Sequence, residues 1–456
     1  MTTSPRTSRH RRPVFLDESG VRWRWVRRFT VALGVVTTAL YAVLAIAVII
    51  PPSVPDLALA DAPATRTPKL VTSRKERLRL AKRLQLWFSL EANHPPPAMR
   101  AQLLPVKGKL PPGKHREPGQ PIVAGFYVNW DDNSLVALRA HANDLDWVVC
   151  EWGFLYPGGD SLRLRIDRKV PFSLARDIPN EKDRPQLFLM LSSFDSASKK
   201  WDAKSLRHML TNPTARANAI RELSDSVYRY GLAGVTLDFE EVPSDLTESI
   251  VSFAKALKAE IGPKGRLVTQ AVSFNDTEHQ LARYASINDK LFLMLYDEHF
   301  GGRGDPGPVA SQQWFVRTAR RMLRTIPPDK AILTVGAYGY DWNDGDSVAN
   351  AQAVTFQEMM SAVRNTREEG RPAGIYFDSL ALNPYARWTD ADSTDHLSWY
   401  LDAVAAYNQF QATRQLGAAG QAIWRLGSED PAIWNVIGKE GIDASPYGLD
   451  SIPAGY

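Results

Sequence analysis

Eight short apolar runs separated by stretches of helical character constrain the fold of this chain more than any other feature. The runs all lie after Pro121, at residues 122–130, 145–154, 186–194, 234–242, 266–274, 291–299, 331–340 and 421–427. Short strands that alternate with helices are typical of β-α units around a parallel sheet. Segments 212–229 and 245–260 have the length that such helices require. Eight such units close naturally into a barrel.

We therefore predict an α/β fold, a (β/α)8 TIM barrel, over residues 121–445, followed by a short tail at 446–456. The segments "AGIYFDS" at 373–379 and "HLSWYLD" at 396–402 lie between the last two predicted barrel strands. They indicate an inserted hairpin or small subdomain before the last strand.

The fourth run, "GVTLDFEEV", carries two carboxylates in an otherwise apolar strand. Because alternate residues of a barrel strand face the interior, Thr236, Asp238 and Glu240 should point inward and Leu237 outward. Barrel active sites lie at the carboxyl ends of the strands, which is where this pair stands. Two neighbouring carboxylates raise each other's proton affinity, as a general acid near neutral pH requires. The structural alternative is an ion pair with Arg or Lys on a neighbouring strand.

The segment from residue 29 to residue 50 is 22 residues long and has no charged side chain. As a helix it is about 33 Å long, enough to span a bilayer. Seven Arg lie in the 20 residues before it and only Arg66 and Lys69 in the 20 after it. The positive-inside rule then predicts a cytoplasmic segment at 1–28, a transmembrane helix at 29–50 and an extracytoplasmic main domain. A cleaved signal peptide is the alternative, although no A-x-A site follows directly.

Residues 51–120 are rich in proline at both ends and carry a basic stretch between, from Ser73 to Ala92. We interpret them as a linker or stalk. The apolar side chains of the basic stretch could face lipid headgroups or the main domain, but a solvated linker helix explains them as well.

The net charge of +5 is concentrated at the N-terminus, since residues 1–28 alone carry a net charge of +6. The rest of the chain is close to neutral, which argues against nucleic acid as a partner. Cys150 is the only cysteine, so no intrachain disulfide or Cys-x-x-Cys pair exists. The eight His residues include no HxxxH or HxxE pair. We therefore expect neither a metal nor a cofactor.

Four strand motifs resemble those of glycoside hydrolase family 18, in the branch that includes spore-germination hydrolases. The family pattern D-G-x-D-x-D-x-E reads A-G-V-T-L-D-F-E here, so Asp238 and Glu240 match its last two acidic positions. The motif "MLYDEH" resembles the sixth strand of the family. "AYGYDW" from Ala337 and "AIWRLGSEDPAIW" from Ala422 resemble the last strands. The resemblance extends over about residues 121–440.

This resemblance implies a hydrolase of β-1,4-linked N-acetylglucosamine polysaccharides, which the segment at 29–50 would anchor to the membrane. In the family the substrate's own N-acetyl carbonyl attacks the anomeric carbon, giving net retention. Glu240 would act as acid and then base, Asp238 would orient the acetamido N–H, and Tyr296 would donate to its carbonyl oxygen. The implied substrate-binding residues are Trp424, Tyr127, Met294 and Asp297. Simple core packing is the alternative for Trp424, Tyr127 and Met294, and helix capping for Asp297.

The chain departs from the family pattern at two positions, where Ala233 and Thr236 replace aspartates. Thr236 stands where a carboxylate would interact with Asp238. Its presence keeps a second hypothesis open, a barrel of weak or absent activity that binds a cell-surface polysaccharide. A scaffold without any sugar site is a third.

The N-terminal "PVFLDESGVRWRWVRR" and "FYVNWDDNS" from Phe126 also resemble bacterial membrane proteins of a larger type. In these, a family-18-like domain precedes a polysaccharide deacetylase and a processive glycosyltransferase. The sequence contains no T-F-D-D or Q-x-x-R-W motif for those later domains. Such enzymes would therefore act as separate partners, or this chain is a fragment of such a fusion.

Overall fold

The structure is a computed structural model that describes residues 120–301, 305–343 and 351–438. All of them belong to one compact unit. The predicted cytoplasmic segment, transmembrane helix and C-terminal tail lie outside the described residues, as does the linker except for Gln120. Within the described ranges, no helix is both long and apolar enough to cross a bilayer.

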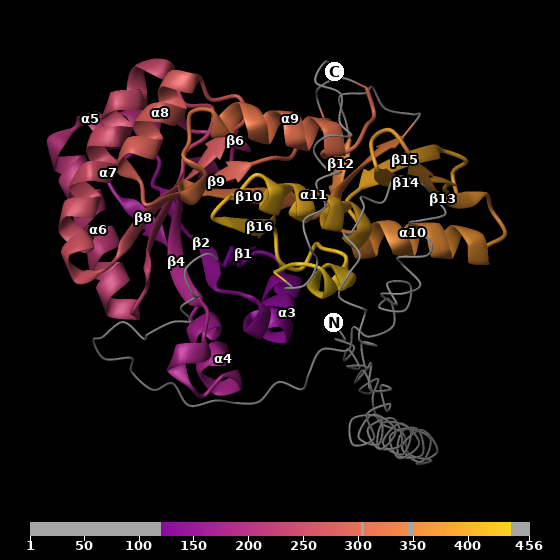
Figure 1. Cartoon of the computed structure of the whole chain (residues 1–456), viewed down its shortest axis with the longest axis horizontal. Coiled ribbons are helices and arrows are strands. Elements are labelled where there is room, and N and C mark those ends of the chain that lie inside the picture. Colours follow the sequence, from indigo (N-terminus) through magenta and orange to yellow (C-terminus); the bar gives the residue numbers. More distant parts are fainter. Residues whose placement is uncertain (1–119, 302–304, 344–350, 439–456) are drawn as a thin grey trace, which may run out of the picture. The chain divides into compact units, whose positions relative to one another are not determined.

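Eight parallel strands form a closed barrel, which confirms the predicted (β/α)8 architecture (Figure 1). Seven pairings run in the order β1-β16-β10-β9-β8-β7-β4-β2, and an eighth pairing between β1 and β2 closes the ring. All eight predicted runs contribute a strand. The strands are β1 (Ile122–Tyr127), β2 (Trp147–Leu155), β4 (Gln186–Ser192), β7 (Gly234–Asp238), β8 (Leu267–Ser273), β9 (Lys290–Met294), β10 (Ala331–Gly336) and β16 (Gly420–Trp424).

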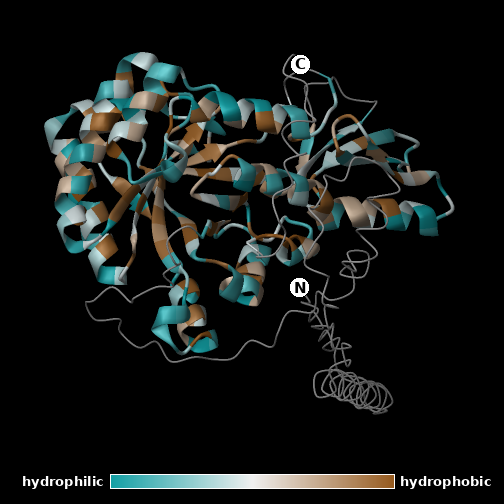
Figure 2. Ribbon diagram, viewed as in Figure 1, coloured by the Kyte–Doolittle hydropathy of each residue, from teal (hydrophilic) through white to brown (hydrophobic). Residues whose placement is uncertain are grey.

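Helices surround the barrel, with their polar residues turned outward and the strands apolar (Figure 2). In chain order they are α3 (Asp132–His141), α4 (Lys169–Asp177), α5 (Ala203–Thr211), α6 (Pro213–Tyr230), α7 (Thr247–Ile261), α8 (Glu278–Ile287), α9 (Gln312–Leu323) and α11 (Ala403–Gln415). A short strand, β3 (Leu162–Leu164), pairs antiparallel with β2, and β5 (Phe194–Asp195) pairs with β6 (Lys200–Trp201).

Local signals define the helix that leads into β7. The side chain of Asn212 caps α6 by accepting from the backbone N–H groups of Thr214 and Ala215, and Pro213 occupies the first turn. Gly231 ends the helix in the left-handed conformation, with φ of 64°. Three residues later, a Cβ added to Gly234 would lie 2.0 Å from the carbonyl oxygen of Leu267. Glycine thus allows β7 to approach β8 closely.

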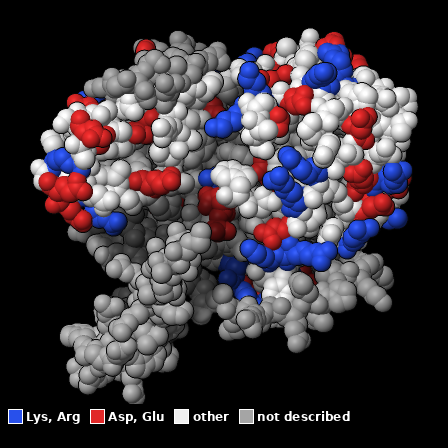
Figure 3. All heavy atoms as spheres, turned by 180° about the vertical axis from the view of Figure 1, so that it is seen from behind, with Lys and Arg blue, Asp and Glu red and all other residues white. Residues whose placement is uncertain are grey.

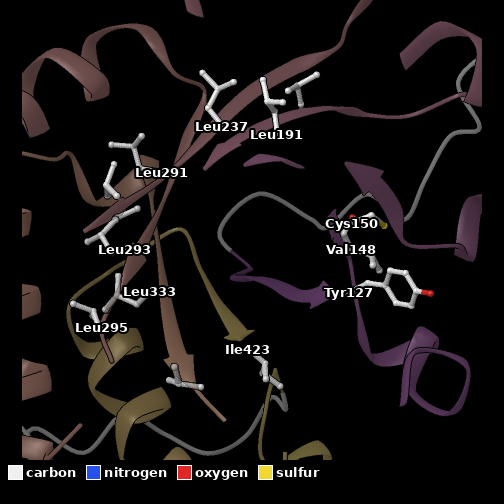
Figure 4. Close-up of a cluster of buried hydrophobic side chains, with 14 of the residues drawn as sticks. Tyr127, Val148, Cys150, Leu191, Leu237, Leu291, Leu293, Leu295, Leu333 and Ile423 are labelled. Carbon is white, nitrogen blue, oxygen red and sulfur yellow. Dashed lines mark hydrogen bonds between the residues drawn. The ribbon is translucent and has the colours of Figure 1, made fainter. Parts of the chain in front are cut away.

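The hydrophobic core has two layers. Outward-facing strand residues such as Leu237 and Leu293 pack against the helices, and Figure 4 shows part of this outer layer. A second cluster fills the barrel interior and includes Phe126, Phe188 and Phe292. Each fully buried side chain of this size contributes about 1.5–3 kcal/mol to folding. Together the two layers hold the strand ends that carry the polar residues described below.

The insertion before β16 is larger than predicted. It is a five-stranded antiparallel sheet of β11 (Gly339–Asn343), β12 (Gln352–Val354), β13 (Ala373–Asp378), β14 (Asn383–Thr389) and β15 (Asp395–Tyr400). Helix α10 (Phe356–Glu368) lies along this sheet (Figure 1) and shares an apolar cluster with it. The run predicted as one barrel strand at 331–340 is divided, because β10 ends at Gly336 and β11 enters the inserted sheet.

Candidate active site

Asp238 is the last residue of β7 and points into the barrel. Its register partners are Ser192 on β4 and Ala271 on β8, and Ala271 belongs to the interior cluster. Its side chain is buried. The pKa of this carboxyl is raised to about 7, mainly by burial; the Ser192 hydroxyl opposes the shift and the negative charge of Glu151 adds to it.

Glu240 follows two residues after Asp238, on the same side of the chain. Phe239 between them packs into the outer core layer, as the alternation predicted. Glu240 keeps some contact with solvent. Its pKa is nevertheless raised well above the usual range, first by burial and then by the negative charges of Asp238 and Asp297. Protein largely surrounds this carboxyl, which favours its protonated form.

The ion-pair alternative for this pair finds no support. Among the residues described, no Lys, Arg or His lies within salt-bridge distance of Asp238 or Glu240. The carboxylates that face Glu240 include Asp276, which accepts from the backbone N–H of Ser273 at 2.9 Å. Burial raises the pKa of Asp276 to about 6. The mouth of the barrel is therefore rich in carboxyl groups that bind protons near neutral pH.

Strand β9 brings Met294, Tyr296 and Asp297 to the same mouth. Met294 packs in the interior cluster, and Tyr296 lies against it, partly exposed. The pKa of the Tyr296 hydroxyl is raised well above its usual value by burial and by the charges of Glu240, Asp238 and Asp297. The hydroxyl therefore remains a hydrogen-bond donor at all relevant pH values.

Asp297 does not cap a helix. It has a left-handed backbone, with φ of 62°, and accepts hydrogen bonds from the hydroxyls of Tyr338 and, at 3.1 Å, Tyr340. The following helix, α9, is instead capped by Ser311. Because Tyr340 belongs to β11, Asp297 connects the inserted sheet to the barrel mouth.

Trp424 ends β16 and lies at the top of the interior cluster. It is partly exposed, and its ring meets that of Phe126 edge-on at 5.3 Å between centroids. The Trp424 ring is thus packed against Phe126, while the residue keeps some exposure to solvent.

The expected place of Tyr127 was wrong. Tyr127 packs in the outer core layer (Figure 4), and its hydroxyl donates to Asp167 at 2.6 Å. Its neighbour Phe126 faces the interior instead. The run "IVAGFYVN" is apolar at almost every position, so it offers no alternation from which the inward face could be read.

Thr236 also faces the barrel interior, where its hydroxyl hydrogen-bonds that of Thr269 on β8 at 2.8 Å. Both threonines are completely buried. The position that is acidic in the family pattern is therefore occupied here by a neutral, internally satisfied pair.

Two residues of this mouth, Glu151 and Trp130, were not predicted from the sequence. Glu151 is buried near the end of β2, and Trp130, which follows β1, is 60% exposed and donates its indole N–H to Glu151 at 2.7 Å. The guanidinium of Arg425 lies over the Trp130 ring at 4.2 Å and bonds Asp131 at 2.5 Å. Glu151 is a carboxylate within the apolar run "WVVCEWGF", and the same pattern in β7 identified Asp238 and Glu240. This pattern could therefore have identified Glu151 as well.

Within the described ranges, no group of three or more His, Cys, Asp or Glu side chains is arranged to hold a metal ion. On the face of the molecule in Figure 3, acidic and basic side chains both occur, and the described surface is not of a single sign. The side chains that the described residues bring to the mouth include carboxyl, phenol and aromatic groups.

A closed β/α barrel with a carboxyl of raised pKa, a second carboxyl and a tyrosine at its mouth has the groups that general acid–base catalysis requires. The family model for glycosyl hydrolases family 18 matches residues 122–430, more than half of the chain. The chain therefore belongs to the glycosyl hydrolases of family 18.

Similar proteins include the cortical fragment-lytic enzymes of Bacillus subtilis and Bacillus anthracis. The first is 23% identical over 242 residues, covering 51% of this chain and 56% of the relative. The second is 22% identical over 259 residues, covering 55% of this chain and 58% of the relative. This chain thus spans little more than half of the length of either protein.

Solved structures with the same fold include two bacterial proteins. The Bacillus cereus spore cortex-lytic enzyme SleL has a TM-score of 0.59 and 20% identity, with 69% of this chain and 73% of that chain covered. A chitinase from Chromobacterium violaceum has a TM-score of 0.60 and 19% identity, with 72% of this chain and 99% of that chain covered.

Proposed function

We propose that this protein is a membrane-anchored glycoside hydrolase that cleaves β-1,4-linked N-acetylglucosamine polysaccharides with retention, through assistance by the substrate. The observation that carries this proposal is the barrel mouth, where Asp238 and Glu240 stand two residues apart and their negative charges face the Tyr296 hydroxyl. The names of similar proteins, which include cortex-lytic enzymes and a chitinase, support this substrate class.

The first step uses the proton of Glu240. Glu240 gives this proton to the glycosidic oxygen while the N-acetyl carbonyl oxygen of the sugar attacks the anomeric carbon. The bond to the leaving sugar breaks, and an oxazolinium ion forms on the substrate. In the second step, the Glu240 carboxylate accepts a proton from water, which attacks the anomeric carbon and restores the N-acetyl group. Both displacements invert the anomeric carbon, so the product retains its configuration.

Asp238 and Tyr296 orient the attacking group. Ionised Asp238 accepts from the acetamido N–H, and its negative charge stabilises the positive charge of the oxazolinium ion. The Tyr296 hydroxyl donates to the carbonyl oxygen and holds it beneath the anomeric carbon. Trp424 provides an apolar floor for the sugar ring, beside Met294, while Asp297 fixes the tyrosines next to the site.

Thr236 favours a second candidate function, a barrel that binds polysaccharide and cuts it slowly or not at all. Its hydroxyl is already satisfied by Thr269, so it offers Asp238 no charge. Retained oligosaccharide binding without turnover would select this alternative. Recovery of turnover in Thr236→Asp would identify a decayed enzyme.

The location is part of the proposal. We propose a cytoplasmic N-terminus, one helix at 29–50 and a catalytic domain outside the cytoplasm. Its support is the uncharged segment and the excess of Arg before it. We also propose a polysaccharide deacetylase or glycosyltransferase that acts on the same polymer as a partner.

The stereochemistry of the first product tests the mechanism. Proton NMR during hydrolysis of a chito-oligosaccharide should show the β-anomer first, before mutarotation. The matched glucose polymer, which lacks N-acetyl groups, should not be cleaved. An initial α-anomer, or equal cleavage of the two polymers, would contradict assistance by the substrate.

A further inference from the structure

At the level of Thr236 in the barrel interior, neither β7 nor β8 carries a second carboxylate that could lie beside Asp238. Thr236 and Thr269 occupy that level as register partners and satisfy each other's hydroxyl at 2.8 Å. Both are buried and uncharged. Any further negative charge next to Asp238 inside the barrel must therefore come from another strand.

Glu151 is such a charge, and strand register places it in the barrel interior. On one side its register partner is Met190 of β4, and Met190 is in turn the partner of Thr236. Residues paired in this way point to the same face of a sheet, and Met190 belongs to the interior cluster. Glu151 thus lies at the level of Thr236, two strands away. The register of β2 shifts directly after Glu151, a local irregularity that re-aims the strand end.

The side chain of Glu151 is buried, with 8% of its surface exposed. Its Oε2 accepts from the indole N–H of Trp130 at 2.7 Å. Among the residues described, Trp130 is the hydrogen-bond donor to this carboxylate, and its Oε1 accepts no hydrogen bond. The neighbouring cation, Arg425, is directed elsewhere, to Asp131 and to the face of Trp130.

We propose that Glu151 is a positioning residue that supplies, from β2, the second negative charge beside Asp238 which Thr236 does not supply. This inference rests on the proposed function for its meaning in catalysis. The charge itself is a property of the unliganded protein and can be tested without substrate.

Electrostatics agree with this assignment. The charge of Glu151 raises the pKa of Asp238, and burial raises the pKa of Glu151 itself against the opposing effects of Trp130 and Arg425. The other charged or titratable groups that face the pair are Glu240 from the end of β7 and Tyr296 from the end of β9. Two buried carboxyls of this kind resist simultaneous ionisation, so the charge of one raises the pKa of the other.

The experiment is a titration of Asp238 in the detergent-solubilised full chain. The protein is labelled with 13C at the aspartate carboxyl groups, and the Asp238 resonance is assigned by its loss in Asp238→Asn. In Glu151→Gln, which keeps the shape and an acceptor for Trp130, the Asp238 midpoint should move to lower pH. In the charge-conserving Glu151→Asp it should stay high.

Two further variants separate charge from packing. Trp130→Phe removes the indole donor that favours ionised Glu151 but leaves the carboxyl in place, so the Asp238 midpoint should fall less than in Glu151→Gln. The double variant Glu151→Gln/Thr236→Asp returns a carboxylate to the interior and should bring the midpoint back up. A role of Glu151 only in holding Trp130 predicts neither of these titration results.

An unchanged Asp238 midpoint in folded Glu151→Gln would overturn this inference, even if the enzyme hydrolyses polysaccharide normally. A lowered midpoint in a protein that cleaves no polymer would instead support the coupling and refute the proposed function. The two failures are therefore distinguishable.

Discussion

At the scale of single residues, the site depends on carboxyl groups held where their charged forms are disfavoured. Burial is the largest cause for both Asp238 and Glu240. Glu240 also faces the charges of Asp238 and Asp297, so its proton is bound more tightly than usual. Glu240 can therefore keep its proton and act as an acid at a pH where Asp238, two residues earlier in the chain, is ionised.

The pH dependence of hydrolysis follows from these directions. Catalysis requires ionised Asp238 and protonated Glu240, and the pKa of Asp238 is about 7. The rate should therefore rise as the pH increases through about 7 and fall at higher pH, when Glu240 loses its proton. Measurement of kcat/KM against pH on a chito-oligosaccharide checks this. A rate that is already maximal at pH 4 would contradict it.

Asp238 should also reduce stability at neutral pH. Its folded-state pKa of about 7 lies above the ordinary value of 3.8, so the folded state binds more protons between these pH values. Stability then falls as the pH rises through this window. We expect Asp238→Asn to raise the free energy of unfolding by about 1–3 kcal/mol at pH 8 and by much less near pH 4.

Denaturant unfolding at both pH values measures this effect, and Asp195→Asn is the matched control. Asp195 is a partly exposed carboxylate, and its pKa is lowered by hydrogen bonds from Ser198 and Ala197. Asp195→Asn should bring no gain in stability at pH 8. An Asp238→Asn protein that is less stable than wild type at pH 8 would refute the account of a costly buried charge.

At the scale of elements, β7 positions the carboxylates because its first residue has no side chain. In Gly234→Ala the new Cβ would meet the Leu267 carbonyl oxygen at 2.0 Å, so β7 and β8 would have to separate. We expect a loss of about 2–4 kcal/mol in stability and a matching loss of activity. Thermal unfolding measures the first.

Gly262→Ala is the control for this prediction. Gly262 has φ of −62°, and its added Cβ would meet only Lys258 Cγ, at 3.6 Å. Stability should change by less than about 1 kcal/mol. Equal effects of the two substitutions would show that close packing of β7 on β8 is not what Gly234 provides.

The sequence predicted the barrel strands well because each is a short apolar run bounded by helical segments. Which side chains of a strand face the barrel interior could be predicted only where polar and apolar residues alternate, as in "TLDFE". The same prediction failed in the uniformly apolar β1, where Tyr127 was misplaced. The inserted sheet was underestimated because its five strands pair across distant segments. Glu151 reaches the mouth from another strand, a closeness that spacing along the sequence does not encode.

At the scale of the whole molecule, the proposal joins a barrel that acts on polysaccharide to a membrane anchor. Full-length protein should remain in the membrane fraction after carbonate extraction, and protease added from outside should cleave the barrel in intact cells. Deletion of residues 1–50 should release the protein from the membrane. Protection of the barrel from external protease would contradict the proposed orientation.

The central claim is that Glu240 gives a proton to the bond that is cleaved. The most direct test compares wild-type protein with Glu240→Gln in the release of reducing ends from chito-oligosaccharides and peptidoglycan glycan strands. Glutamine preserves the shape but cannot transfer the proton, so we expect a loss of at least about 10²-fold in kcat with oligosaccharide binding retained. Equal rates for the two proteins would contradict the account.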